Sequence, residues 1–86
     1  MPTIEIYSKG YCPFCKKTKL TFEQLNLNFR EFDITNNLDK AREMYLRSHR
    51  RTVPQIFING FHVGGNDDLQ EALQSGLLNK LLTSSS

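Results

Sequence analysis

The only two cysteines of the chain, Cys12 and Cys15, lie in the segment Tyr11-Cys12-Pro13-Phe14-Cys15. Two thiols at this spacing can close on each other as a disulfide. If the segment begins a helix, the unpaired backbone N–H groups and the dipole at that end favour negative charge on the first sulfur. The motif therefore predicts that Cys12 is a thiolate nucleophile and that Cys15 is a second thiol within its reach.

A pair of cysteines can also be half of a zinc site, but zinc requires about four ligands. The remaining candidates are His49, at the end of a predicted helix, and His62, in a predicted hairpin strand, and we interpret both as surface or half-buried side chains. Pro13 suits the first turn of a helix, where its missing N–H is not needed. We therefore favour redox chemistry and expect no metal ion.

The hydrophobic pattern that must position these thiols predicts an α/β fold in the order β-α-β-α-β-β-α, plus a short C-terminal helix. The predicted strands are 3–7, 29–34, 55–58 and 61–63. A βαβ unit makes the first two strands parallel, and Asn59-Gly60 predicts a tight hairpin between the last two, because both central residues of a type I′ turn need positive φ. These elements form a four-stranded mixed sheet with helices on both faces.

Helical spacing also predicts which side chains face the core and where the helices end. The expected apolar positions are Phe14, Thr18, Phe22 and Leu25 in the first helix, and Leu38, Ala41, Tyr45 and Leu46 in the second. Asp67 and Gln70 have the spacing of a capping box for the third helix, and Gly76 follows that helix. Residues 83–86 are expected to be a frayed tail.

Composition narrows the classes of protein to consider. The 86 residues form one predicted domain, 1–86, and a formal net charge of +2 is too small to argue for nucleic acid binding. No apolar run approaches the ~18 residues of a membrane span. The first five residues lack the basic and apolar regions of an export signal, so we expect a cytoplasmic protein, with no membrane or nucleic acid partner and a monomeric state.

A second motif, Thr52-Val53-Pro54, comes directly before a predicted strand. Proline pushes the preceding residue into an extended conformation, so Val53 can offer its backbone N–H and C=O to a peptide lying alongside. The simpler interpretation is that Pro54 only starts the strand. Together with the two cysteines, the motif predicts a cis-proline opposite an active-site thiol.

The third motif is Gly64-Gly65-Asn66-Asp67, before the third helix. Glycines let a ligand approach the backbone, and the helix start exposes N–H groups that can accept a carboxylate. The alternative is a plain hairpin exit followed by a helix cap.

With these three motifs in this order and spacing, the chain resembles a small dithiol glutaredoxin from Ile4 to Leu81. The resemblance implies a thioredoxin-like fold and a groove for glutathione as co-substrate. It makes Cys12 the nucleophile and Cys15 the resolving thiol. One departure is visible: Phe14 stands where the commonest motif of the family has tyrosine, so an aromatic wall remains but a hydroxyl is absent.

The same resemblance implies how glutathione binds. Lys9 contacts its glycyl carboxylate, Val53 pairs with its cysteinyl unit, and Asn66 with Asp67 holds the γ-glutamyl end. Arg51 is a weaker candidate for a carboxylate contact. The other implied members of the site are Phe14, Thr52, Pro54 and Gly65.

The implied reaction is glutathione-dependent reduction of protein–glutathione mixed disulfides and protein disulfides, with glutathione reductase acting indirectly. One alternative is a redoxin of the same fold that receives electrons from a flavoprotein reductase. The other is an iron–sulfur or metal-binding module in which Cys12 and an external glutathione hold a cluster between two chains.

Overall fold

The computed structural model describes residues 2–83 of the chain. Its centre is a four-stranded sheet in the order β2-β1-β3-β4. The strands are β1 Ile4–Ser8, β2 Arg30–Asp33, β3 Gln55–Ile58 and β4 Phe61–Gly64. β1 pairs in parallel with β2 and antiparallel with β3, which pairs antiparallel with β4. This is the mixed sheet that the sequence predicts, within one or two residues at each strand end.

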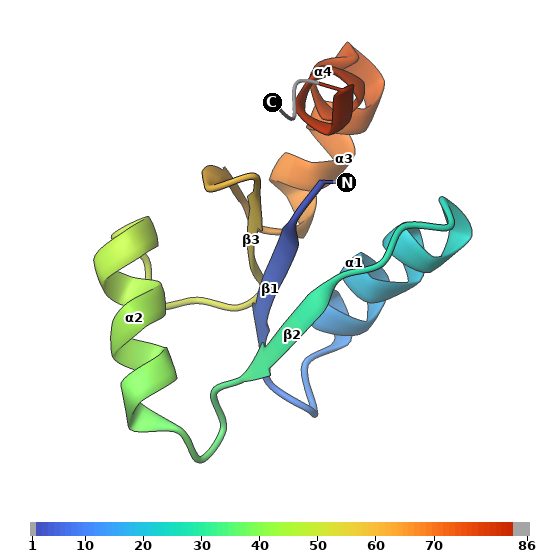
Figure 1. Cartoon of the computed structure of the whole chain (residues 1–86). Helices are drawn as coiled ribbons and strands as arrows, with labels where there is room; N and C mark the ends of the chain where they lie inside the picture. Colours follow the sequence, from blue (N-terminus) through green and yellow to red (C-terminus); the bar gives the residue numbers. More distant parts are fainter. Residues whose placement is uncertain (1, 84–86) are drawn as a thin grey trace.

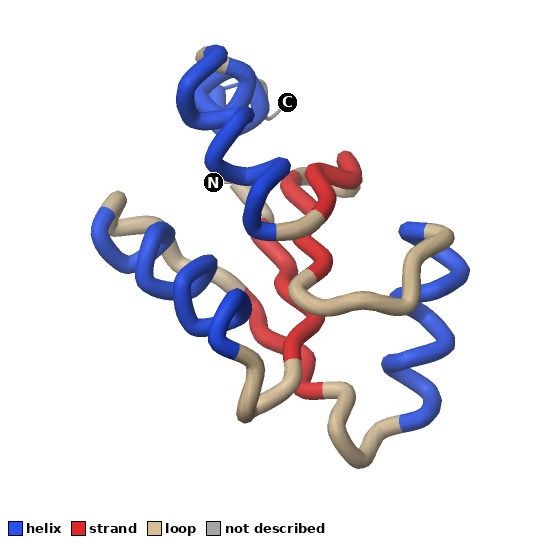
Figure 2. The backbone as a smooth tube through the Cα atoms, turned by 180° about the vertical axis from the view of Figure 1, so that it is seen from behind, coloured by secondary structure: helices blue, strands red, loops and turns tan. Residues whose placement is uncertain are grey.

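Four helices surround this sheet: α1 Pro13–Gln24, α2 Leu38–Ser48, α3 Asn66–Ser75 and α4 Leu77–Thr83. α2 lies on one face, whereas α1 and the C-terminal helices lie on the other (Figures 1 and 2). Because successive side chains of a strand point to opposite faces, β1 sends Ile6 to the α1 side and Tyr7 to the α2 side. Both side chains are fully buried, as expected for a central strand covered on both faces.

The larger apolar cluster fills the face under α1 and α3. Its buried members are Ile4, Ile6, Phe22, Ile56, Ile58, Leu69, Ala72 and Leu78. Phe22 and Thr18 of α1 point into the protein as the spacing predicts, but Phe14 and Leu25 are largely exposed. Phe14 is therefore free to line a site beside the cysteines.

The face under α2 is smaller and corrects one prediction. Met44 and Ser48 are the buried residues of α2, and Ala41 packs beside them. Leu38, Tyr45 and Leu46, which the sequence predicts to face the core together with Ala41, are exposed. α2 instead turns Met44 towards the apolar side chains of Tyr7, Ile34 and Phe57. Beside this cluster, Arg47 donates to Tyr7 and Glu5, and Tyr7 donates to Glu43.

Turns and caps position the last third of the chain. Asn59 and Gly60 have φ values of 52° and 83°, which confirms the predicted hairpin turn. The predicted cap of α3 by Asp67 and Gln70 is wrong, because Asp68 Oδ2 accepts the N–H of Gly65 at 2.9 Å. Gly76, with φ of 84°, ends α3 as predicted.

The end of the described chain brings one further correction. Thr83, predicted to begin a frayed tail, belongs to α4, and its hydroxyl donates to Asn79 O at 2.9 Å. The remainder of that predicted tail, residues 84–86, lies outside the described residues. No helix within residues 2–83 is long and apolar enough to cross a membrane.

Candidate active site

Cys12 occupies the N-cap position of α1, and Pro13 is the first helical residue. The N–H of Cys12 donates to Lys9 O at 3.1 Å, which closes the loop between β1 and α1. Both cysteines are free thiols, but Cys12 is partly accessible whereas Cys15 has an exposed fraction of 0%. The helix therefore presents one sulfur to substrate and keeps the other inside.

The surroundings of Cys12 favour its thiolate. Burial alone would raise the pKa of Cys12, but hydrogen bonds from the N–H and thiol of Cys15 and from the N–H of Phe14, together with the charge of Lys9, outweigh it. The pKa of Cys12 therefore lies below its ordinary value. This is the effect predicted for a thiol at a helix N-terminus.

Cys15 has the opposite protonation behaviour. Burial, together with the neighbouring Cys12, raises its pKa to about 12 against an opposing backbone hydrogen bond at Lys9. A protonated Cys15 can donate its S–H to the Cys12 thiolate. The two thiols are thus assigned different tasks by their positions in one helical turn.

The second motif faces Cys12 across the loop before β3. The Val53–Pro54 peptide bond is cis, as the sequence predicts. The Cys12 thiol lies 3.8 Å from Val53 O, within the range of a sulfur hydrogen bond. The backbone of Val53 therefore passes beside the reactive sulfur, where an extended peptide can lie.

A buried glutamine holds this loop in place. Gln55 Nε2 donates to Thr52 O at 3.0 Å and to its Oγ1 at 3.2 Å, and Gln55 Oε1 lies 2.8 Å from His62 Nε2. Gln55 is only 1% exposed, so its amide cannot turn freely to other partners. Burial lowers the pKa of His62, which keeps this imidazole neutral near pH 7. We interpret Gln55 as the side chain that positions Thr52 and, through it, Val53.

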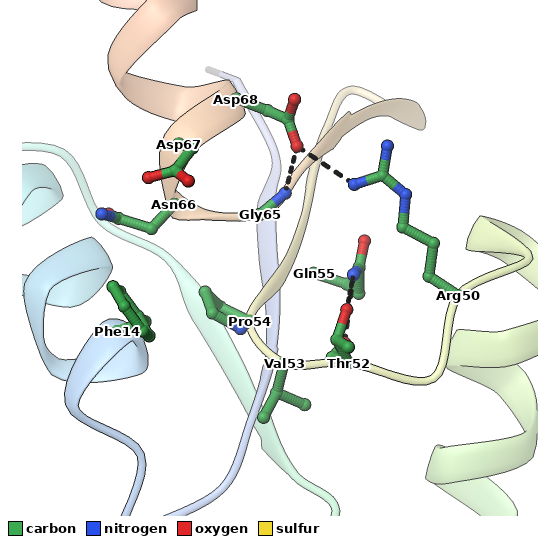
Figure 3. Close-up of a pocket in the computed structure, with 10 residues that line it drawn as sticks. All are labelled: Phe14, Arg50, Thr52, Val53, Pro54, Gln55, Gly65, Asn66, Asp67 and Asp68. Atoms are coloured by element: carbon green, nitrogen blue, oxygen red, sulfur yellow. Dashed lines mark hydrogen bonds and ion pairs between the residues drawn. The ribbon is translucent and has the colours of Figure 1, made fainter.

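A pocket of about 230 Å³ lies between the start of α1, this loop and the start of α3. We call it the thiol pocket because Phe14, which stands between the two cysteines, and Val53, which lies beside Cys12, line it; neither cysteine does (Figure 3). It is lined by Phe14, Arg50, Thr52, Val53, Pro54, Gln55, Gly65, Asn66, Asp67 and Asp68. The structure thus brings together seven of the predicted glutathione-binding residues: Phe14, Thr52, Val53, Pro54, Gly65, Asn66 and Asp67.

The start of α3 forms one wall of the thiol pocket. The N–H groups of Asn66 and Asp67 belong to its first turn and have no acceptor within the helix. Asn66 Oδ1 accepts the Thr18 hydroxyl at 3.0 Å, which anchors this wall to α1. Asp67 is exposed and free to meet a positive group.

Gly64 is needed for the packing of this wall, and it does not line the pocket. It has φ of +119°, and a Cβ there would lie 2.3 Å from Asp68 Oδ2. The same carboxylate oxygen accepts Arg50 Nη1 at 3.0 Å (Figure 3). Gly64 therefore leaves room for Asp68 to cap α3, whereas Gly65 is the glycine that lines the pocket.

Two of the predicted residues lie elsewhere. Lys9 and Arg51 line a second hollow, of about 440 Å³, between the β1–α1 loop and α2. We call it the cationic hollow. Lys9 acts on the Cys12 thiolate by its charge, and the Arg51 guanidinium lies 4.9 Å from the centre of the Tyr45 ring. The structure therefore does not bring these two residues into the thiol pocket.

Residues 4–63 match the family model described as Glutaredoxin. The chain belongs to the glutaredoxin family. Like the family as a whole, this glutaredoxin is a thiol–disulfide oxidoreductase with a thioredoxin-like fold, and both of its cysteines are free thiols.

Individual relatives agree over nearly the whole chain. Glutaredoxin 3 of Escherichia coli K12 is 44% identical over 82 residues, which cover 95% of this chain and 99% of that protein. The crystal structure of a buckwheat glutaredoxin–glutathione complex superposes with a TM-score of 0.83 at 31% identity, covering 93% of this chain and 76% of that one. The solution structure of glutaredoxin from Brucella melitensis gives 0.82 at 37% identity, with 98% and 91% covered.

Sequence reasoning missed three residues of the thiol pocket: Arg50, Gln55 and Asp68. Asp68 carries a readable signal, because it stands three residues after Gly65, at the spacing of an acidic helix cap. Arg50 carries none, because nothing in two adjacent arginines says which one turns towards α3. Within residues 2–83 of this glutaredoxin, no three His, Cys, Asp or Glu side chains are grouped so that they could hold a metal ion.

Proposed function

We propose that this glutaredoxin uses glutathione to reduce protein–glutathione mixed disulfides and protein disulfides through the Cys12 thiolate. The observation that carries the proposal is the contrast between two thiols of one helical turn, in which the pKa of Cys12 is lowered and that of Cys15 is raised to about 12. One sulfur is ready to attack, and the other holds a proton next to it.

The first step is thiol–disulfide exchange. The Cys12 thiolate attacks the glutathione sulfur of a mixed disulfide, the substrate sulfur leaves as a thiolate that takes up a proton, and a Cys12–glutathione disulfide forms. A second glutathione thiolate attacks its glutathione sulfur, and the products are glutathione disulfide and the Cys12 thiolate. Glutathione reductase then returns glutathione disulfide to the reduced state.

A protein disulfide follows a second route through Cys15. Cys12 forms a mixed disulfide with one sulfur of the substrate, and Cys15 gives up its proton and attacks Cys12. The reduced substrate leaves, and two glutathione molecules reduce the resulting Cys12–Cys15 disulfide. Since Cys15 is buried, this step requires the thiol to deprotonate away from solvent.

The arrangement of charge around Cys12 supports glutathione as the reductant. The tripeptide carries an α-amino and α-carboxylate group at its γ-glutamyl end and a carboxylate at its glycyl end. Asp67 and the first turn of α3 suit the γ-glutamyl end, and Lys9 and Arg51 suit the glycyl carboxylate. The cysteinyl unit would then lie along Val53, whose carbonyl already faces Cys12. The buckwheat neighbour, a glutaredoxin–glutathione complex, supports the same proposal.

The decisive experiment is turnover of a glutathionylated peptide with glutathione as the only reductant, coupled to glutathione reductase and NADPH. We expect reduction that depends on the glutathione concentration. Reduction that instead requires a flavoprotein disulfide reductase, with glutathione inactive, would show the reductase-driven alternative. A coloured, sulfide-containing protein after anaerobic expression, without reductase activity, would show the iron–sulfur alternative.

We also propose that the protein acts as a monomer in the cytoplasm. Light scattering after gel filtration measures the oligomeric state, and cell fractionation measures the location. A stable dimer, or recovery outside the cytoplasm, would contradict the corresponding part.

A further inference from the structure

The cationic hollow differs in charge from the thiol pocket. The thiol pocket contains two carboxylates, Asp67 and Asp68, and one cation, Arg50, which is paired with Asp68. The cationic hollow is lined by three cations, Lys9, Arg42 and Arg51, and none of its described lining residues is Asp or Glu. A single glycyl carboxylate would neutralise only one of these charges. Two of the three positive charges would therefore remain without a negative partner after glutathione binds.

These three cations also lack carboxylate partners. The ion pairs of the described residues join Lys19 with Glu31, Lys40 with Glu43, Arg47 with Glu5 and Arg50 with Asp68. Lys9, Arg42 and Arg51 are in none of them. Arg42 projects from α2 as an exposed side chain, at the end of the hollow contributed by that helix. Its charge is thus available to a partner.

Apolar side chains accompany the cations. The buried side chains of Ile34 and Met44 contribute to the lining, and Leu38 and Tyr45 of α2 add exposed apolar surface. Leu38 is 83% exposed, although it stands in a helix that could have turned it inward. An occupant that fits this surface combines a carboxylate with an apolar side chain.

The position of the hollow defines which part of a substrate reaches it. In the proposed function, the peptide lies along Val53 with its N-terminal side towards Asp67 and its C-terminal side towards Lys9. A polypeptide bound in place of glutathione would continue past Lys9 along α2. The residues that follow its reacting cysteine would then meet Leu38, Arg42 and Tyr45.

We propose that the cationic hollow is a specificity site for protein substrates whose reacting cysteine is followed, within the next few residues, by an apolar and an acidic side chain. This inference rests on the proposed function and names the substrate class of the same site. The chemistry at Cys12 is unchanged: the Cys12–sulfur bond to one thiol breaks as the bond to another forms, with no net oxidation.

An equilibrium measurement tests the preference without relying on turnover. The Cys15→Ser variant, with glutathione bound to Cys12 as a disulfide, is mixed with an acetylated and amidated peptide thiol, and mass spectrometry measures the exchange. The peptides are Cys-Leu-Glu, Cys-Leu-Gln, Cys-Leu-Lys and Cys-Ser-Glu. Exchange of each peptide with glutathione disulfide alone corrects for differences between the free thiols.

We expect Cys-Leu-Glu to be preferred over Cys-Leu-Gln by about three- to tenfold, the range of a few partly exposed charge contacts. Cys-Leu-Lys should be the weakest, and Cys-Ser-Glu should fall below Cys-Leu-Glu. Adding salt should reduce the difference between the Glu and Gln peptides, because it screens exposed charges.

Variants of Arg42 locate the effect. In the Cys15→Ser background, Arg42→Gln should remove most of the Glu-over-Gln preference, and Arg42→Glu should make Cys-Leu-Lys the favoured peptide. Arg30→Gln, which removes an exposed arginine of β2 that does not line the hollow, is the matched control and should leave the preference intact.

Equal exchange constants for the Glu, Gln and Lys peptides would overturn the inference, as would a preference that survives Arg42→Glu. Either result leaves the proposed function standing if the wild-type protein still turns over a glutathionylated peptide with glutathione. Loss of that turnover would instead contradict the proposed function, whatever the order of the peptides.

Discussion

Cys12 and Cys15 lie in the same helical turn but in two different chemical environments. Cys12 caps α1, has access to solvent, and gains hydrogen bonds from the start of the helix that lower its pKa. Cys15 points into the interior, where burial and the neighbouring Cys12 raise its pKa to about 12. The comparison shows that a shift of three residues along one helix is enough to separate a nucleophile from a proton-holding partner.

The largest effect is expected at the exposed thiol. Cys12→Ser should reduce glutathione-dependent turnover of a mixed disulfide by on the order of 10³-fold or more, because the attacking group is removed. The coupled assay with glutathione reductase measures the rate, and circular dichroism checks that the variant is folded. Residual activity close to that of the wild type would mean that Cys12 is not the nucleophile.

Removing the buried thiol should separate the two substrate classes. Cys15→Ser should keep turnover of a glutathionylated peptide at the same order of magnitude, since glutathione itself completes that cycle. Reduction of a protein disulfide should fall steeply, because nothing resolves the intermediate. If both activities were lost, the dithiol route would be obligatory and the division of roles between the cysteines would be wrong.

Titration should separate the thiols by pH. Thiolate absorbance should show Cys12 ionising well below about 8.5, the value of a free thiol. Because only the thiolate attacks, the turnover rate should rise with pH through the pKa of Cys12 and then level off. Cys15 stays protonated until about pH 12, so the wild-type thiolate transition at lower pH reports Cys12, and an ordinary pKa there would contradict the role of the helix terminus.

The buried thiol should in turn affect alkaline stability. Above the pKa of an unfolded cysteine, the unfolded chain releases a proton that native Cys15 retains until about pH 12. The unfolded state is then favoured, so the free energy of unfolding should fall as pH rises from about 9, by at most about 1.4 kcal/mol per pH unit for one group. Urea unfolding under reducing conditions measures this slope.

The matched variant for that measurement is Cys15→Ala. Tyr7 also has a pKa of about 12, chiefly because of burial, and adds to the alkaline loss in both proteins. The difference between their slopes therefore reports Cys15 alone. Identical slopes for wild type and Cys15→Ala would show that Cys15 is not held protonated by the fold.

The smallest effect is expected at Lys9. Its charge is the last of the influences on Cys12, so Lys9→Gln should raise the pKa of Cys12 by less than about one unit. Lys80→Gln, on distant α4, is the control and should leave that pKa unchanged. If the pKa of Cys12 in Lys9→Gln rose to the ordinary value of a free thiol, the charge of Lys9, and not the helix start, would be the main cause of the lowered pKa.

Most of the fold could be read from local signals that agree with one another. Alternating Ile4 and Ile6 predict β1, Asn59-Gly60 predicts the hairpin, and Pro13 predicts where α1 begins. Each of these signals depends on the backbone preference of one or two residues. The thiol chemistry was predictable for the same reason, because the cysteine positions follow from the helix start.

What could not be predicted depends on distant neighbours. The side of α2 that faces the sheet is set by Arg47, whose partners Tyr7 and Glu5 lie about forty positions away in the sequence. Apolar spacing instead indicated Leu38, Tyr45 and Leu46. In the same way, Arg50 turns to Asp68 while adjacent Arg51 turns to Tyr45, and only the folded chain distinguishes them.

The helices attach to the two faces of the sheet through two separate apolar clusters. α1 and α3 share one apolar core, so unfolding of that core would disrupt both the thiol site on α1 and the α3 wall. α2 is attached separately, with Met44 as its buried apolar anchor and Arg47 as its polar one. Val53, which passes beside Cys12, packs on the same cluster as Met44, so local opening of α2 would reach the Val53 backbone but not the apolar core shared by α1 and α3. Cys12 lies at the start of α1, whereas exposed side chains of α2 border the cationic hollow, so substitutions at Leu38 or Arg42 should change the choice of substrate while the chemistry at Cys12 stays the same.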